Sequence, residues 1–178
     1  MNVNEFKNKI KANRPLLDNR YEILFTPPQI LQSTYSKENL ETISAYGRNL
    51  NAFGRNIMTS DVRQGRSFQL PYANQYNTTN FTVMLDKKYV TKNFFDDWQD
   101  SIMHPSKPIL KSFYKQYVTD VIINHFNEFG EISQSIRLVD AFPSIVGDVN
   151  FASDGSNNIA IISITISFRY WERISQGQ

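Results

Sequence analysis

The chain has 178 residues, enough for one domain that buries roughly 70% of the surface its unfolded form exposes. Its 19 basic and 17 acidic residues give a net charge of +2, which is too balanced to indicate a nucleic-acid or membrane-surface protein. The complete absence of cysteine excludes disulfides, thiolate chemistry and cysteine-containing zinc sites.

The first part of the chain predicts an N-terminal arm over residues 1–14, with a short basic helix near residues 4–11. This arm has no apolar segment typical of a secretory signal, and no run approaches the ~18 apolar residues of a membrane span, so we expect no membrane anchor. The stretch RYEILF, residues 20–25, then predicts a first strand that ends before Pro27.

Residues 31–66 have a weaker pattern, with three glycines and many Ser, Thr and Asn side chains. We predict a long extended loop with short strand pieces, unusually large for a compact domain. Two strands are predicted after it, at residues 66–73 and 80–87.

A single long helix is predicted at about residues 88–103. Val90, Phe94, Trp98 and Ile102 recur every fourth residue and form an apolar stripe, while acidic side chains occupy the opposite face. Pro105 follows and closes the helix.

The C-terminal half predicts mostly strands, at residues 116–127, 131–142, 147–152 and 159–171, with turns at Gly130 and Gly155. The last strand alternates with a period of two. One face carries Ile162, Ile164, Ile166, Phe168 and Tyr170, and the other carries Ser163, Thr165, Ser167 and Arg169. At ~3.3 Å per residue this strand would be ~43 Å long, about twice the usual length.

These elements predict a mainly β fold: a two-sheet antiparallel β-sandwich or barrel with one flanking α-helix and a long extended loop. The whole chain, residues 1–178, is then a single domain. The predicted core includes Phe94, Trp98, Ile102, Ile164, Ile166 and Phe168.

The sequence contains no pattern typical of an enzyme. Its two histidines, His104 and His125, have no carboxylate or second histidine at a metal-ligand spacing, and no phosphate-binding loop is present. We therefore expect neither catalysis nor a cofactor or metal. The acidic cluster Asp96, Asp97 and Asp100 is either a solvated helix face or a docking surface for a basic partner.

The last third carries the most specific pattern. A strand leads into Ala141-Phe142-Pro143 and then Val146-Gly147, a polar turn follows at residues 153–158, and the long strand ends in Tyr170-Trp171-Glu172. Upstream, the strand NFTVMLDK precedes a helix centred on Phe95-Asp96-Asp97-Trp98-Gln99, and NRPLLDNRYEILF leads into the first strand. In order and spacing, residues 13–172 resemble the tail tube proteins of contractile-tailed bacteriophages, which are related to type VI secretion tube proteins.

The resemblance implies a structural subunit that forms hexameric rings, which stack into a hollow tube in the phage tail after synthesis in the host cytoplasm. The implied partners are further copies of the chain, the tail sheath, the tape-measure protein, and the baseplate tube-initiator and tail terminator proteins. DNA would pass through the channel without specific binding. The helix acids Asp96, Asp97 and Asp100 would face the sheath, and the long loop, with Gly47, Arg48, Gly54, Arg55 and Arg63, would bridge rings.

A polar strand face suits a channel lining, because a continuous cationic stripe would hold the DNA phosphates. The candidate lumen residues are Ser133, Ser135, Arg137, Ser163, Thr165, Ser167 and Arg169, with the arginines as isolated positive charges. The alternative is that this face is the outside of an ordinary sandwich in contact with bulk water.

Two other functions are compatible with this sequence. The same fold could serve as a tube-initiating baseplate protein or a type VI secretion-like tube, although the chain length favours the major tube protein because initiators carry additional domains. A monomeric ligand-binding β-sandwich would instead have a concave aromatic pocket and form no rings.

Overall fold

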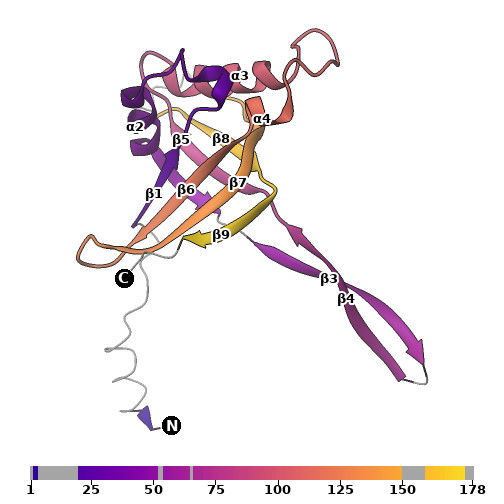
Figure 1. Ribbon diagram of the computed structural model, residues 1–178. Coiled ribbons are helices and arrows are strands. Elements are labelled where there is room, and N and C mark those ends of the chain that lie inside the picture. The colour runs from indigo at the N-terminus through magenta and orange to yellow at the C-terminus, as the bar shows by residue number, and fades with distance from the viewer. Residues whose placement is uncertain (1, 4–19, 52–53, 65, 150–158, 175–178) are drawn as a thin grey trace, which may run out of the picture.

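The computed structural model describes residues 2–3, 20–51, 54–64, 66–149 and 159–174. These residues form a mainly antiparallel β fold, as predicted, with helices gathered at one end (Figure 1). The strands are β1 Tyr21–Phe25, β2 Gly47–Asn51, β3 Arg55–Gln64, β4 Arg66–Tyr76, β5 Thr79–Met84, β6 Thr119–Phe126, β7 Ile132–Val146, β8 Ile161–Ser167 and β9 Tyr170–Ile174. The helices are the short 3-10 helix η1 Gln29–Leu31 and the α-helices α2 Lys37–Ala45, α3 Val90–Ile102 and α4 Tyr114–Tyr117.

Seven strands form one bent sheet rather than two separate sheets. The strand order is β1-β6-β7-β8-β5-β2, and β9 also pairs with β7. The first half of β7 pairs with β6 and β9, while its second half, from Phe142 to Val146, pairs with β8. The long strand β7 is therefore shared by both halves of the sheet.

The two halves of the sheet face each other across the core, which gives the predicted sandwich-like arrangement. Phe25 of β1 and Phe81 of β5 come from opposite halves, and their ring centroids lie 5.4 Å apart. Phe95 of α3 contacts both rings, at 5.6 and 5.8 Å. The buried Ile164 and Ile166 belong to the same core, and the partly buried Phe168 packs against it.

Helix α3 forms where predicted and closes one end of the core. Asp86 starts it, because its carboxylate accepts hydrogen bonds from the amides of Lys88, Val90 and Thr91 at 3.1–3.2 Å. Phe94, Phe95 and Trp98 are fully buried, and Ile102 is nearly so. The Trp98 indole donates a 2.7 Å hydrogen bond to the carbonyl of Tyr117, which satisfies its polar atom.

The prediction of a single helix is wrong, because residues 31–66, predicted as an extended loop with short strand pieces, also contain a helix. This region holds α2, β2 and β3, with η1 ending at Leu31. Helix α2 begins after Ser36, whose hydroxyl accepts the amide of Asn39, and it buries Leu40 and Ile43. Only these two apolar residues point inward, so the sequence of this helix has no recognisable apolar repeat with the period of a helix.

The predicted final strand is interrupted at Phe168 and Arg169, between β8 and β9. Both strands nevertheless follow β7 in one register, with Ser167 opposite Phe142 and Tyr170 opposite Val139. At this point β7 bends at Asp140, which has a positive φ of 54°.

The bend exchanges the inward and outward faces. In β7 the buried apolar residues are Ile136 and Leu138 before the bend but Ala141 after it. In the paired strand, Trp171 packs against the core instead of Tyr170. The prediction that Tyr170 shares the face of Ile166 is therefore wrong, because the strict alternation of inward and outward side chains is interrupted at the bend.

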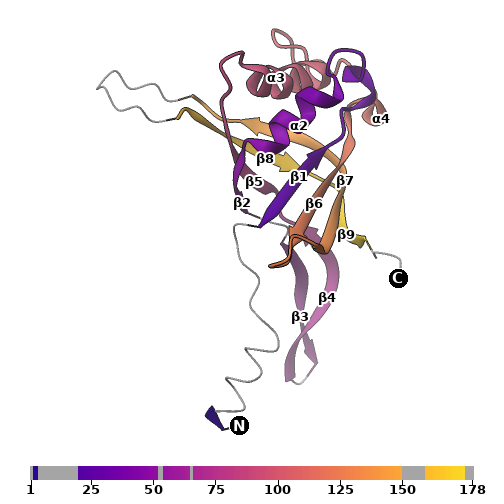
Figure 2. The same ribbon diagram turned by 90° about the vertical axis from the view of Figure 1, so that its left-hand side faces the viewer.

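The sheet does not close into a barrel, because no backbone ladder joins its end strands β1 and β2 in the described residues. The seam is bridged by a side chain, since the Tyr21 hydroxyl donates a hydrogen bond to the carbonyl of Arg48. Figure 2 shows β1 and β2 close together beneath α2.

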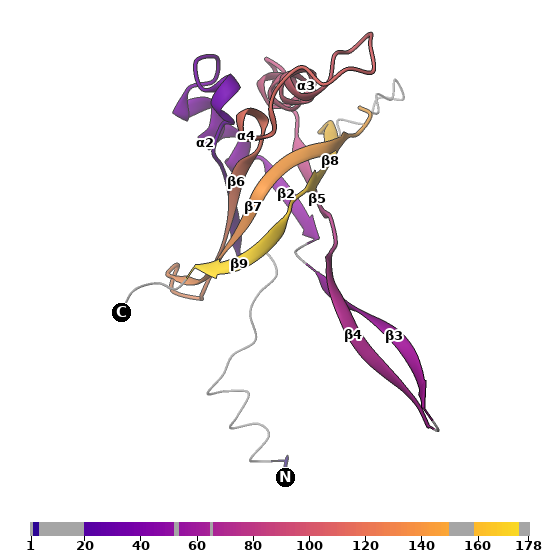
Figure 3. The same cartoon turned by 45° about the vertical axis from the view of Figure 1, so that its right-hand side comes forward.

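Strands β3 and β4 form a separate two-stranded hairpin that projects away from the sheet (Figures 1 and 3). Apart from residues 2–3, the predicted N-terminal arm lies outside the described residues, as do the turn at residues 154–155 and residues 150–152 of the predicted strand 147–152. Within the described part of the chain, no helix has the length and apolarity needed to cross a membrane.

Candidate assembly surfaces

The polar face of β8 lies on the outside of the sheet, away from the core. Ser163 is exposed, and Thr165 and Ser167 are half-buried. Asn80 and Thr82 of β5 pair with Thr165 and Ser163, so the polar surface continues across two strands. Sequence reasoning omitted Asn80 and Thr82, although the alternation of Thr82 with Phe81 and Val83 indicated their outward direction.

The serines of β7 differ from one another. Ser133 is exposed, but Ser135 is buried, with 6% of its surface accessible. The Ser135 hydroxyl donates a 2.7 Å hydrogen bond to the Asn124 side chain, which is itself buried. Ser135 therefore stabilises the β6–β7 pair and is not part of a solvated lining.

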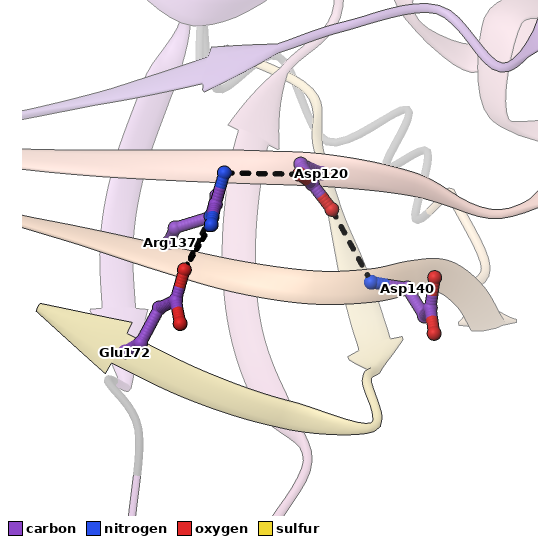
Figure 4. Close-up of polar contacts among 4 residues, drawn as sticks. All are labelled: Asp120, Arg137, Asp140 and Glu172. Carbon is purple, nitrogen blue, oxygen red and sulfur yellow. Dashed lines mark hydrogen bonds and ion pairs between the residues drawn. The ribbon is translucent and has the colours of Figure 1, made fainter. Parts of the chain in front are cut away.

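Both arginines of the predicted lumen face lie in a network of carboxylates at the bend, and Figure 4 shows the part of it around Arg137. Arg137 donates to Glu172 of β9, with Nε 2.8 Å from the carboxylate oxygen, and its guanidinium lies 3.8 Å from Asp120 of β6. Asp120 in turn accepts the backbone amide of Asp140 at 3.4 Å. Arg169 extends the network, 3.6 Å from the Asp140 carboxylate.

The prediction that these arginines are isolated positive charges is therefore wrong. Two arginines face three carboxylates, so the network carries one net negative charge when all five groups are ionised. The hydrogen bond to Glu172 raises the pKa of Arg137. Burial and the nearby Asp140 raise the pKa of Tyr114. A surface of this kind offers DNA phosphates no uncompensated cation.

The sequence contained a partial indication of this network. Asp140 interrupts the apolar run of LVDAF in a strand, which is an unfavourable place for an acid unless it has a partner. Its pairing with Arg169, and that of Arg137 with Glu172, depends on the register of β7 with β9, which the sequence alone does not specify.

The β3–β4 hairpin exposes a row of apolar side chains on one face, and Ile57 is exposed on the opposite face. Val62 lies opposite Phe68, Ser60 opposite Leu70 and Met58 opposite Ala73, so these residues share a face. Phe68 and Leu70 keep 47% and 46% of their surface exposed. We call this surface the hairpin face. An isolated two-stranded hairpin is at best marginally stable in water, so such a face needs a partner.

The residues predicted to bridge rings are not brought together. Gly47 and Arg48 lie in β2 on the body of the molecule, whereas Arg55 and Arg63 lie near the two ends of β3. Gly54 lies just before β3, and its carbonyl accepts the amide of Asn77 at 3.3 Å. Arg55 places its guanidinium 5.9 Å from the ring centre of Trp171, which ties the hairpin base to β9.

The acidic face of α3 is partly engaged within the subunit. Asp97 accepts a 2.6 Å hydrogen bond from the Tyr35 hydroxyl, and Asp96 pairs with Lys92. Burial and the hydrogen bond to Asp97 raise the pKa of Tyr35. Asp100 is exposed.

The described residues contain no group of three potential metal ligands. His104 contacts Ser106 through Nδ1, and burial lowers the pKa of His125. A surface groove between the C-terminal end of α3 and β7 is lined by Phe142 among mostly polar and aliphatic residues, and a second open hollow beside the β6–β7 turn is lined by Tyr21, Phe126 and Phe129.

Taken together, the bent antiparallel sheet, its polar outer face and its projecting apolar hairpin define a structural β protein built for contacts with other chains. A family model described as phage tail tube protein matches residues 16–174. The chain therefore belongs to the phage tail tube protein family, and it is a structural protein of the viral tail rather than an enzyme.

Individual relatives are distant. The tail tube protein gp19 of Enterobacteria phage T4 is 24% identical over 92 residues, which cover 51% of this chain and 56% of the T4 protein. The match thus spans about half the length of this curated relative.

Solved structures from contractile machines share the fold. A chain in the structure of the anti-feeding prophage tube-terminating cap aligns with a TM-score of 0.63 and 20% identity, covering 90% of this chain and 91% of that one. A chain in the extended sheath–tube complex of the extracellular contractile injection system PVC aligns with a TM-score of 0.58 and 17% identity, covering 94% and 97%.

Proposed function

We propose that the chain is the repeating subunit of a contractile tail tube, in which six copies form a ring and rings stack into a hollow channel. The tape-measure protein fills this channel during assembly, and DNA passes through it afterwards. The subunit is made in the host cytoplasm and incorporated into the virion tail. A tube-initiator or terminator position in the same tube is the alternative.

The observation that carries this proposal is the hairpin face. Phe68, Leu70 and Met58 project from the body on a hairpin that no other element among the described residues covers extensively. A second copy in the next ring supplies the missing partner. A head-to-tail contact of this kind is heterologous, and heterologous contacts that do not close generate open filaments.

Open sheet edges support ring formation. Strand β9 pairs only with β7, and β2 pairs only with β5, within the described residues. Unpaired edges of this kind attract further strands unless they are covered. Joining subunits edge to edge around a ring removes them, as closure does in a barrel.

The outer face of β5, β8 and the bend then lines the channel. Its hydroxyl and amide side chains hydrate a passing polymer, and the carboxylates around Arg137 and Arg169 prevent the arginines from holding phosphates. The exposed acids of α3 are directed at the sheath in this arrangement, and the tube ends contact the baseplate and terminator proteins.

The proposal is tested by sedimentation velocity and negative-stain microscopy of the purified chain. The wild type should form rings and tubes as its concentration rises. The variant Phe68→Ser/Leu70→Ser should retain a wild-type unfolding transition but lose tubes. The matched control Thr59→Ser/Gln69→Ser changes the opposite face of the same hairpin and should assemble normally. A wild-type chain that stays monomeric at every concentration and salt condition would refute the tube function.

A further inference from the structure

Besides the hairpin, two exposed segments lie at opposite ends of the subunit. The loop between α3 and α4, residues 103–113, projects at the helical end in all three views. The turn between β6 and β7, residues 127–131, lies at the other end, where the β3–β4 hairpin also projects.

The α3–α4 loop combines apolar and basic side chains. Ile109, Leu110 and Phe113 are 58%, 64% and 82% exposed. Lys107 and Lys111 are also exposed, and neither forms an ion pair within the described part of the chain. No acidic residue occurs from Met103 to Lys115. We call this surface the basic knob.

The basic knob is held in a defined shape. Met103 and Leu110 form a β-bridge, and the amide of His104 donates to the carbonyl of Ile109 at 3.0 Å. The amide of Lys111 donates to the carbonyl of Ile102 at 2.9 Å. These bonds fold the loop into a small hairpin, so little conformational freedom is lost when the knob binds.

The β6–β7 turn has the opposite charge. Its tip carries Glu128 and Glu131 on either side of Phe129, which is 78% exposed. The Asn127 side chain accepts the amides of Phe129 and Glu131, both at 2.9 Å. Gly130 provides the positive φ of 81° that the turn requires. We call this surface the acidic tip.

Among the described residues, Arg20 borders the acidic tip. Arg20 donates from its guanidinium to the carbonyl of Asn127 at 3.0 Å, at the foot of the turn. The tip itself, residues 127–132, contains two acids and no basic residue.

We propose that the basic knob of one subunit docks on the acidic tip of a second copy in the adjacent ring. Each surface has exposed aromatic or aliphatic side chains at its centre with charged side chains beside them. The charges are positive on the basic knob and negative on the acidic tip. The two surfaces lie at opposite ends of one chain, so each copy offers a knob in one direction and a tip in the other. This inference rests on the proposed tube function and gives the stack a second contact besides the hairpin face.

The charges set the polarity of the stack. A ring placed upside down would bring knob against knob, or tip against tip, with like charges opposed. The correct orientation brings Lys107 and Lys111 to Glu128 and Glu131, with Phe129 and Phe113 supplying apolar contact. Head-to-tail stacking is then favoured over head-to-head stacking.

A charge exchange tests the contact. Lys107→Glu/Lys111→Glu and, separately, Glu128→Lys/Glu131→Lys should each raise the concentration for half-maximal tube formation by at least about tenfold, while single rings persist. Combining all four substitutions should restore tubes. Lys87→Glu/Lys88→Glu, at exposed positions before α3, is the control of equal charge change and should assemble normally. Tubes that form normally with either reversed pair, or no rescue in the combined variant, would overturn the proposal.

Cross-linking gives a second readout that does not require tubes. Because the chain contains no cysteine, Lys111→Cys and Glu128→Cys each introduce a single thiol. In an equimolar mixture of the two variants, a short bismaleimide should give well over twice as much mixed dimer as either homodimer, because random coupling alone gives the three dimers in the ratio 1:2:1. A yield at that random ratio would contradict the docking, even for a chain that forms no rings. If the wild type forms neither rings nor tubes but the mixed dimer prevails, the tube function fails and the contact stands.

Discussion

Removing the carboxylates around Arg137 and Arg169 should convert the outer sheet face into a DNA-binding surface. The perturbation is the triple substitution Asp120→Asn/Asp140→Asn/Glu172→Gln, which preserves shape but removes three negative charges. Arg137 keeps 43% of its side-chain surface exposed and Arg169 keeps 69%, so both guanidinium groups can reach a phosphate.

The magnitude follows from counterion release. Two additional phosphate contacts per subunit should steepen the slope of log affinity against log salt by about 1.8 for duplex DNA. Between 50 and 200 mM salt, the variant should therefore lose about twelvefold more affinity than the wild type loses. The wild type, with its arginines neutralised, should bind weakly at all salt concentrations.

The assay compares free subunits with assembled tubes, and linear with closed circular DNA. Free variant subunits should bind both DNA forms. Variant tubes should not bind circular DNA if the face lines the channel, because a closed circle cannot thread through a tube. Strong binding of circular DNA to tubes would place the face on the exterior, and an unchanged salt slope in free subunits would show that the acids do not neutralise the arginines.

Three further substitutions test the fold that supports these surfaces. Asp86→Ala removes three hydrogen bonds to the start of α3 and should lower the free energy of unfolding by about 1 kcal/mol in urea denaturation. Hydrogen bonds from backbone amides outweigh the effect of burial and lower the pKa of Asp86, so this stabilisation is fully present above the unfolded pKa of ~3.9. The difference in stability between wild type and variant should therefore disappear as pH falls through the folded pKa. Gly147→Ala should cost about 1–3 kcal/mol in the same assay, because its new Cβ would lie 2.9 Å from the carbonyl oxygen of Ser163; an unchanged midpoint would refute that close approach. Ile166→Asp should abolish the cooperative thermal transition seen by circular dichroism, because an unpaired charge would be buried at a position 1% exposed, and a folded variant that still forms rings would contradict the assigned face.

The parts of the fold that the sequence predicts well are those with a long, regular hydrophobic period. Helix α3 repeats its apolar residues every fourth position, and β8 alternates strictly from Ile162 to Ile166, so both were recognisable. Helix α2 has only Leu40 and Ile43 directed inward, and its other signal, the cap at Ser36, is one that many loops share.

The candidate site was predictable only in part, because it depends on contacts between distant segments. The polar positions of β8 follow from alternation within one strand. The neutralised arginines and the buried Ser135 follow from cross-strand partners in β6 and β9 that lie 11 to 35 residues away in sequence. Strand register fixes such partners, and composition does not encode register directly.

The bend at Asp140 links these observations physically. Because of the bend, the long strand β7 belongs to both halves of the sheet, and Trp171 rather than Tyr170 packs against the core. A positive φ at a non-glycine residue costs free energy, and the Asp140 carboxylate has a compensating partner in Arg169, while its amide donates to Asp120. The same charges that stabilise the bend also neutralise the outer face. Local strain, sheet geometry and surface charge are therefore properties of one cluster of side chains.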